Sequence, residues 1–96
     1  MEVKASATKE GVGLTWQAAE PAMDGDFPSY YVIYRVLKDQ PIQPENPRQI
    51  LTIYKGESTY RDTTAQRGER YVYAITAVDR LHNESRLSEE VGVKAK

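Results

Sequence analysis

The chain has 96 residues, no cysteine and nearly balanced charge, with 13 basic and 14 acidic residues. This length is that of one domain, and the absence of cysteine excludes disulfides and thiolate chemistry. Nucleic-acid binding and attachment to an anionic membrane both need a basic excess, which the chain lacks. No apolar run approaches the roughly 20 residues of a membrane-spanning helix. We therefore expect no nucleic-acid partner and no membrane insertion.

Apolar and polar residues alternate over short stretches, which is the pattern of half-buried strands. The first two predicted strands cover residues 3–8 and 12–16, with a tight turn at Gly11 between them. Residues 18–29 predict a loop, because its prolines and glycine suit neither a strand interior nor a helix. A strong strand follows over residues 30–37, apolar on both faces except at Arg35.

The rest of the chain continues in the same rhythm. Residues 38–48 contain three prolines and predict an extended surface loop. Further strands are expected over 50–54, 59–62, 70–78 and 89–95. Seven strands with turn signals about every 8–12 residues are typical of an immunoglobulin-like sandwich. The predicted fold class is therefore all-β, a seven-stranded antiparallel sandwich.

Three motifs then point to a family. They are Leu14-Thr15-Trp16, Tyr30-Tyr31-Val32-Ile33-Tyr34-Arg35, and the pair Tyr60-Arg61-Asp62 and Tyr71-Val72-Tyr73-Ala74-Ile75-Thr76-Ala77-Val78-Asp79. Over essentially its whole length the chain resembles a fibronectin type III domain. We therefore expect residues 1–96 to form a single domain, excised from a longer protein.

The resemblance implies a topology and a core. It implies that the first, second and fifth strands pack against the third, fourth, sixth and seventh. It also makes Tyr71 the corner tyrosine, whose hydroxyl bonds to the backbone just upstream. The expected structural core includes Trp16, Tyr34, Tyr71 and Tyr73, together with Val12, Leu14, Tyr30, Val32, Ile75, Ala77, Val91 and Val93.

The loop residues resemble the bacterial branch of the family, in the string from Asp79 to Ser85 above all. Such modules sit beside catalytic domains of secreted carbohydrate-active enzymes, glycoside hydrolases in particular. This implies a non-catalytic spacer or docking module, extracellular or periplasmic, whose partners are a neighbouring domain of the same polypeptide and polysaccharide. The isolated domain is expected to be a monomer without a cofactor.

No catalytic or metal site is expected from the residues. Calcium needs six to eight oxygen ligands, so Asp24-Gly25-Asp26 is better explained as a solvated turn. The single histidine, His82, lies near Glu84 and Ser85, but a short turn rarely supplies the geometry of a Ser-His-Asp relay. Asn83 begins a glycosylation pattern, yet it equally suits a turn.

A contact surface is the remaining candidate site. If Tyr30, Val32 and Tyr34 point inward, side-chain alternation places Tyr31 and Ile33 outward. Together with Val72 and Ala74 they would form one apolar face for interdomain contact. That candidate face is made of Tyr31, Ile33, Val72 and Ala74.

Several alternatives to this contact face remain open. The 38–48 loop could cover the apolar face locally. Alternatively, Phe27, Tyr31 and Tyr54 could stack on sugar rings. The module could also bind glycan or protein independently through its loops at 18–29, 55–58 and 79–86.

Overall fold

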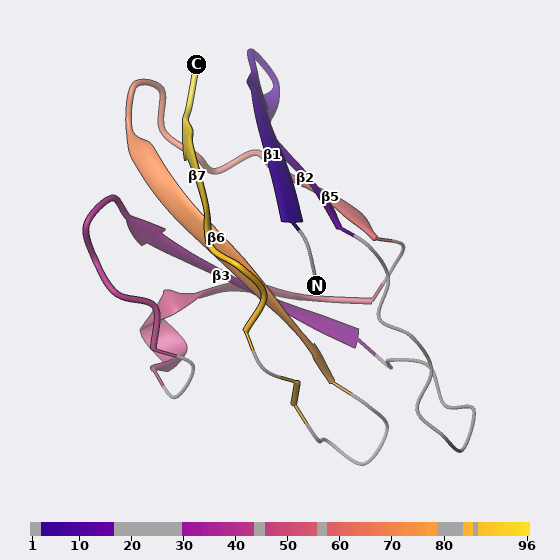
Figure 1. Cartoon of the computed structure of the whole chain (residues 1–96). Helices are drawn as coiled ribbons and strands as arrows, with labels where there is room; N and C mark the ends of the chain where they lie inside the picture. The colour runs from indigo at the N-terminus through magenta and orange to yellow at the C-terminus, as the bar shows by residue number, and fades with distance from the viewer. Residues whose placement is uncertain (1–2, 17–29, 44–45, 56–57, 79–83, 86) are drawn as a thin grey trace.

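The computed structural model describes residues 3–16, 30–43, 46–55, 58–78, 84–85 and 87–96 and shows two layers of sheet (Figure 1). The elements are β1 (Val3–Thr8), β2 (Gly11–Trp16), β3 (Tyr30–Leu37), the 3-10 turn η1 (Pro47–Gln49), β4 (Ile50–Tyr54), β5 (Thr59–Asp62), β6 (Arg70–Val78) and β7 (Val91–Lys94). A small sheet of order β1-β2-β5 packs on a large sheet of order β4-β3-β6-β7. This confirms the predicted fold class and the predicted division of strands.

Gly11 determines how closely the first hairpin approaches β5. Its φ of 131° lies in the region that favours glycine. A Cβ built there would lie 2.4 Å from the backbone oxygen of Asp62, which is far inside contact distance. The next residue, Val12, is the register partner of Asp62. The hairpin can therefore pair with β5 in this register only because residue 11 has no side chain.

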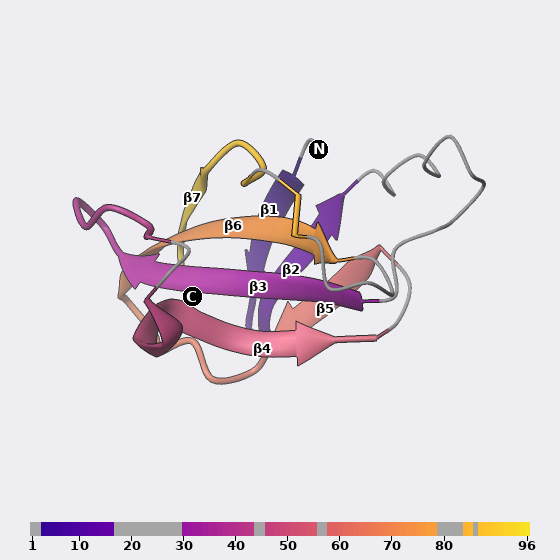
Figure 2. The ribbon, with the colours of Figure 1, turned by 90° about the horizontal axis from the view of Figure 1, so that it is seen from below.

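The central pair of the large sheet is β3 with β6, and Figure 2 shows both running between β4 and β7. Their antiparallel register runs from Tyr30 opposite Val78 to Leu37 opposite Tyr71. Cross-strand partners project from the same face of a sheet. Arg35 and Tyr73, which are partners, therefore lie side by side on the face toward the small sheet.

The core between the sheets is built around Trp16. Its ring meets Tyr31 edge-on at 5.2 Å between centroids and Tyr54 at 6.4 Å. Trp16, Tyr71 and Tyr73, which the resemblance placed in the core, are all buried in this cluster. The full set of buried members is Val3, Val12, Leu14, Trp16, Tyr31, Ile33, Tyr71, Tyr73, Ile75, Ala77 and Ala95.

The expected orientation of β3 is wrong. Tyr31 and Ile33, expected outside, belong to the core between the sheets. Tyr30, Val32 and Tyr34, expected inside, belong to a separate cluster on the outer face of the large sheet. The reason is the register, because the inward residues of β6 have odd numbers and pair with odd-numbered residues of β3. The expected orientation of β6 agrees with the structure.

Replacing Trp16 by alanine should remove about 3–5 kcal/mol from the free energy of unfolding, through lost burial and the cavity left behind. Chemical denaturation followed by tyrosine fluorescence or circular dichroism would measure the loss.

Trp16→Phe is the matched control. The indole N–H of Trp16 is buried without an acceptor among the described residues, and phenylalanine removes that donor while keeping a ring. We expect Trp16→Phe to cost clearly less than Trp16→Ala. An alanine variant as stable as the parent would contradict a core centred on Trp16.

Candidate functional site

The outer face of the large sheet is covered by the chain itself. We call the buried residues there the outer cluster: Val32, Tyr34, Val36, Ile42, Ala74 and Val78. Ile42 comes from the connection after β3, and the partly buried Ile50 and Leu87 also pack on the cluster. This is the local cover that the sequence left open as an alternative.

Gln49 holds this covering connection in place. Its amide nitrogen donates to the backbone oxygen of Pro41 at 2.9 Å, and its side-chain oxygen accepts from the backbone N–H of Gln43 at 2.6 Å. These two bonds join η1 to the segment that carries Ile42. These hydrogen bonds within the connection fix its shape, in addition to the packing of Ile42 on the sheet.

The four residues of the predicted contact face do not share a face. Tyr31 and Ile33 lie between the sheets, whereas Ala74 is buried and Val72 half-buried on the outer side. The apolar side chain that remains exposed beside the outer cluster is Ile53, on the edge strand β4 and 60% exposed. It is the register partner of Val32 and so extends the outer cluster toward solvent.

The expected aromatic platform for sugar stacking does not form from Tyr31 and Tyr54. Both rings pack edge-on against Trp16, and Tyr54 also meets Tyr60 at 5.1 Å. Phe27 lies outside the described residues. Tyr31 and Tyr54 therefore do not form a flat row of exposed aromatic rings.

Glu84 fastens the segment before β7 to the outer face. Its Oε2 accepts a hydrogen bond from the Tyr34 hydroxyl at 2.5 Å and another from the Thr76 hydroxyl at 2.6 Å. Ser85 and Ser88 continue the attachment, because their hydroxyls accept from the backbone N–H groups of Ala77 and Ile75. Their role in the structure is thus to pair with the second half of β6, beyond Tyr73, where its pairing with β7 ends.

The other candidate positions in these turns fall outside the described residues. They are Asp24 to Asp26, His82, Asn83, the whole loop at 18–29, residues 56–57 of the loop at 55–58, and residues 79–83 and 86 of the loop at 79–86.

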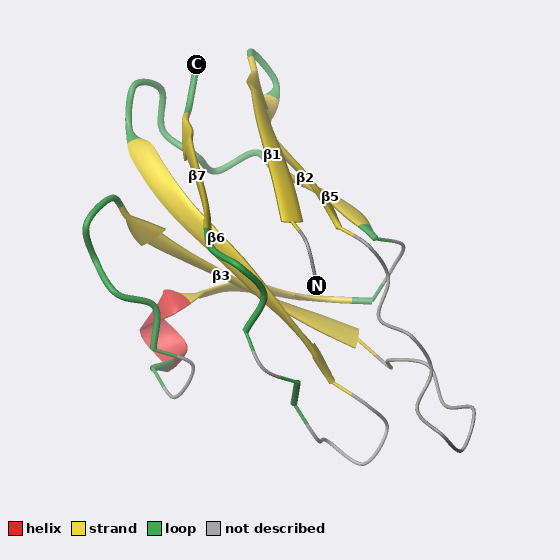
Figure 3. Cartoon of the chain, viewed as in Figure 1, coloured by secondary structure: helices red, strands yellow, loops and turns green. Residues whose placement is uncertain are grey.

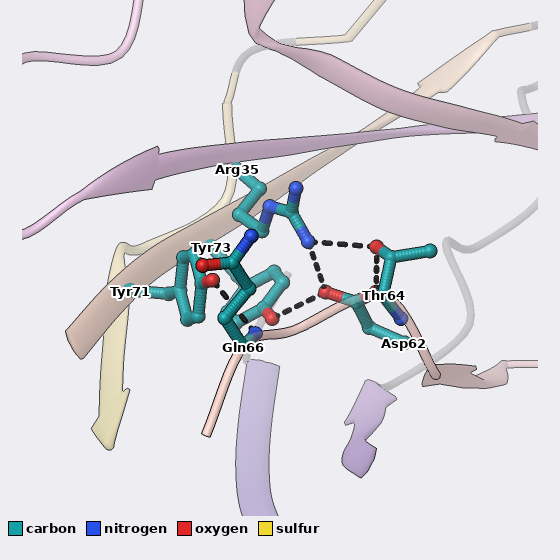
Figure 4. Close-up of polar contacts among 6 residues, drawn as sticks. All are labelled: Arg35, Asp62, Thr64, Gln66, Tyr71 and Tyr73. Carbon is teal, nitrogen blue, oxygen red and sulfur yellow. Dashed lines mark hydrogen bonds and ion pairs between the residues drawn. The ribbon is translucent and has the colours of Figure 1, made fainter. Parts of the chain in front are cut away.

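A polar network joins the two sheets at Asp62, whose side chain is fully buried (Figure 4). Its Oδ2 accepts from Arg35 Nη1 at 2.8 Å and from the Tyr73 hydroxyl at 2.6 Å. Its Oδ1 accepts from the backbone N–H and the hydroxyl of Thr64, at 2.9 and 2.6 Å. Because Asp62 ends β5 while Arg35 and Tyr73 belong to β3 and β6, the carboxylate bridges the sheets.

Tyr71 closes the same end of the core. Its hydroxyl oxygen accepts a hydrogen bond from the backbone N–H of Gln66 at 2.8 Å, which is the corner arrangement that the resemblance implied. The Arg35 guanidinium lies 4.9 Å from the centre of the Tyr71 ring, within range of a cation–π contact. Arg35 therefore has two partners, a carboxylate and an aromatic ring.

Burial and hydrogen bonding act in opposite directions on Asp62. Burial raises the pKa of this carboxyl, but hydrogen bonds from Thr64, Tyr73 and Arg35 outweigh burial, so the pKa lies below its usual value. For Arg35, burial lowers the pKa, and the bond and charge of Asp62 more than restore it. Burial and the neighbouring carboxylate both raise the pKa of Tyr73. The network thus holds an ion pair and a protonated phenol at neutral pH.

These contacts leave the carboxylate little capacity for chemistry. Both oxygens of Asp62 already accept two hydrogen bonds each. A general base must accept a proton from a substrate, and a carboxylate with a lowered pKa and filled lone pairs is poorly suited to that. Among the described residues, no three histidines, cysteines or carboxylates are grouped so as to hold a metal ion. The arrangement is that of a structural bridge.

The sequence did not identify this network. It singled out Tyr60-Arg61-Asp62 as a family pattern but treated Arg35 only as an interruption of an apolar strand. The available signal was that single charge in an otherwise apolar strand, because a buried charge requires a partner of opposite sign.

Replacing Asp62 by asparagine should cost about 3 kcal/mol of stability near neutral pH, since it leaves Arg35 without its counter-ion. We take the lower end of the usual range because the Arg35 side chain is 25% exposed. Urea unfolding of Asp62→Asn and of the parent would measure the difference.

The pH dependence gives this prediction a second readout. In the folded protein the pKa of Asp62 lies below its value in the unfolded chain, which is about 3.8. The ionised carboxylate therefore stabilises the fold at pH values above that unfolded pKa, and this stabilisation is lost as the pH falls through the folded pKa. The gap between parent and Asp62→Asn should therefore be constant near neutrality and shrink in acid. Glu10, exposed and paired with Arg61, is the control carboxylate, and Glu10→Gln should change little. A gap independent of pH would contradict an ionised Asp62.

A family model described as "Fibronectin type III domain SaeA third domain" matches residues 1–96. Among curated proteins, the chain is 34% identical over 90 residues to an amylopullulanase of Thermoanaerobacter thermohydrosulfuricus, covering 94% of this chain and 5% of that protein. It is 35% identical over 63 residues to the glycosyl hydrolase YngK of Bacillus subtilis, covering 62% of this chain and 11% of that protein. The chain thus spans a small part of each relative.

Solved structures share the fold. A β-1,2-glucanase from Parabacteroides distasonis superposes with a TM-score of 0.75 at 24% identity, covering 98% of this chain and 12% of that one. An Fn3-like protein from Clostridium thermocellum gives 0.70 at 22% identity, covering 98% and 88%. Within the described residues, no helix is long and apolar enough to span a membrane. With the family match over its whole length, the corner tyrosine and the two-sheet topology, the chain belongs to the fibronectin type III family.

Proposed function

We propose that the chain is a non-catalytic accessory module of a larger secreted bacterial enzyme that acts on polysaccharide. The observation that carries this proposal is the pattern of coverage, because nearly all of this chain corresponds to one twentieth of an amylopullulanase. The second relative, also a glycosyl hydrolase by name, shows the same relation of part to whole. In such a protein the catalytic residues would belong to another domain.

The described side chains support a structural role. The buried carboxylate, Asp62, is saturated by structural hydrogen bonds, and Glu84 is bonded to Tyr34 and Thr76. Fold alone assigns no activity, so the role is inferred from these side chains and from the relatives.

We further propose that the neighbouring domain contacts the module beside the outer cluster, through Ile53. Ala74 and the rest of the outer cluster are already covered, so the contact is left to the exposed margin of the outer face. Ile53 projects from β4, the edge strand of the large sheet among the strands that the structure describes. An exposed apolar residue at a free edge suits a contact that also covers the edge.

Replacing Ile53 by serine should leave the isolated module within about 0.5 kcal/mol of the parent, because the side chain is 60% exposed. In the full-length product of the gene, the same change should weaken the junction. Limited proteolysis of the linker and hydrogen exchange of Ile50–Tyr54 would measure it.

Leu37→Ser is the matched control, since Leu37 is also apolar and 45% exposed but lies at the far end of β3. We expect extra protection of β4 in the intact protein, lost in Ile53→Ser and kept in Leu37→Ser. Equal exchange of β4 in the isolated module and the intact protein would mean that the module does not dock through this edge.

A further inference from the structure

Three cationic residues form a row across the large sheet. Arg70 on β6 is the register partner of Lys94 on β7. Lys38 follows the last residue of β3 and donates its backbone N–H to the carbonyl of Arg70 at 3.0 Å, which continues the ladder by one position. Lys38, Arg70 and Lys94 therefore occupy one cross-strand row, which we call the cationic row.

The charges of the cationic row are not neutralised within the described part of the chain. The ion pairs there are Arg35 with Asp62 and Arg61 with Glu10, and neither involves the row. The acidic residues adjacent in sequence are Asp39 and Glu69, and neither forms an ion pair with the row. Like charges directly opposite one another on neighbouring strands destabilise a sheet. The row is thus a cost to the fold that its own structure does not offset.

A hollow of about 300 Å³ lies beside this row. The cationic row lines it together with Tyr71, Val72, Gly92 and Val93. Val72 and Gly92 are register partners and form the next pair on the same face of the sheet as Arg70 and Lys94. Because glycine has no side chain, the surface is deeper at Gly92, next to the charges. Nothing in the backbone demands glycine there, because a Cβ would find Tyr71 O at an ordinary contact distance of 3.9 Å.

We propose that the cationic row and its hollow bind an acidic polysaccharide, a chain of uronate sugars. Neighbouring strands lie about 4.8 Å apart, so the row presents positive charges at roughly that interval in a line. A sugar ring has a comparable length, so the carboxylates of a short uronate chain lie within reach of more than one of these long cationic side chains. The apolar floor of Val72 and Gly92 offers a surface for the face of a ring.

The choice of a polysaccharide among linear polyanions rests on the proposed function. The charge geometry itself does not, because a line of cations would attract any anionic polymer. A second group of cations, Lys9, Arg67 and Lys96, lines another hollow of about 450 Å³. Its Lys96 lies two positions beyond Lys94 in the sequence.

The test is calorimetric titration of the 96-residue chain with hexagalacturonate at low and moderate salt. Arg70→Gln and Lys94→Gln should each weaken binding about tenfold, the scale of a hydrogen bond between charged groups. Gly92→Val keeps all charges and fills the hollow, and it should weaken binding as well. Lys4→Gln, an exposed lysine on the small sheet, is the matched control and should leave binding unchanged.

Ligand controls separate the possible sources of affinity. The methyl-esterified oligomer has the same sugar backbone without charge, and we expect it not to bind. Single-stranded DNA is a polyanion without uronate, and Gly92→Val should not alter whatever weak binding it shows. Thermal unfolding would verify folding, since removing one charge of the row should not lower the melting temperature.

Three results would overturn the proposal: no binding of hexagalacturonate, equal binding by the row variants and the parent, or binding of DNA as tightly as uronate with no effect of Gly92→Val. The last result would identify a general polyanion surface. None of these results bears on docking through Ile53, which the intact protein tests separately. Conversely, a module that does not dock could still bind uronate.

Discussion

The alternation of side chains along β3 and β6 governs the rest of this structure. Both strands are apolar on both faces, so a single opposing sheet cannot cover them. The small sheet covers one face, and Ile42, Ile50 and Leu87 pack on the β3 and β6 residues of the other. The connection after β3 and the segment before β7 are therefore parts of a second, thinner core. Their hydrogen bonds through Gln49 and Glu84 serve that cover.

Asp62 determines how the two sheets meet at one end. Apolar packing is not directional, so a hydrogen-bonded group shared by the two sheets adds a fixed point to it. The carboxylate of β5 supplies one, because its four accepted hydrogen bonds come from Arg35 and Tyr73 of the large sheet and from Thr64 in the turn after β5. Gly11 allows β2 to lie close enough for this turn to form. Arg35 completes the bridge and also contacts the corner tyrosine.

Turn residues and strand periodicity are local signals, and they predicted the strands. The sheet composition and the corner tyrosine were implied by the resemblance to the fibronectin type III family. The prediction of which residues of β3 face the core was wrong. Tyr30 and Tyr31 are equally apolar neighbours, so the pattern cannot say which points inward, and the decision depends on the register with β6. The network of Arg35 and Asp62 joins residues far apart in the chain, and no local spacing links them. The predicted contact face was wrong because it relied on the wrong face of β3, where Tyr31 and Ile33 were expected to point outward.

The inward position of Arg35 has a consequence for partly open states of the molecule. The strands Tyr30–Leu37 and Arg70–Val78 are long, β-branched and aromatic, which is the composition of aggregation-prone segments. If the small sheet separates, the exposed face of β3 carries a guanidinium beside Tyr31 and Ile33. A charge in the middle of such a strand opposes stacking with another copy. The residue that joins the sheets in the native state therefore also protects the chain when they part.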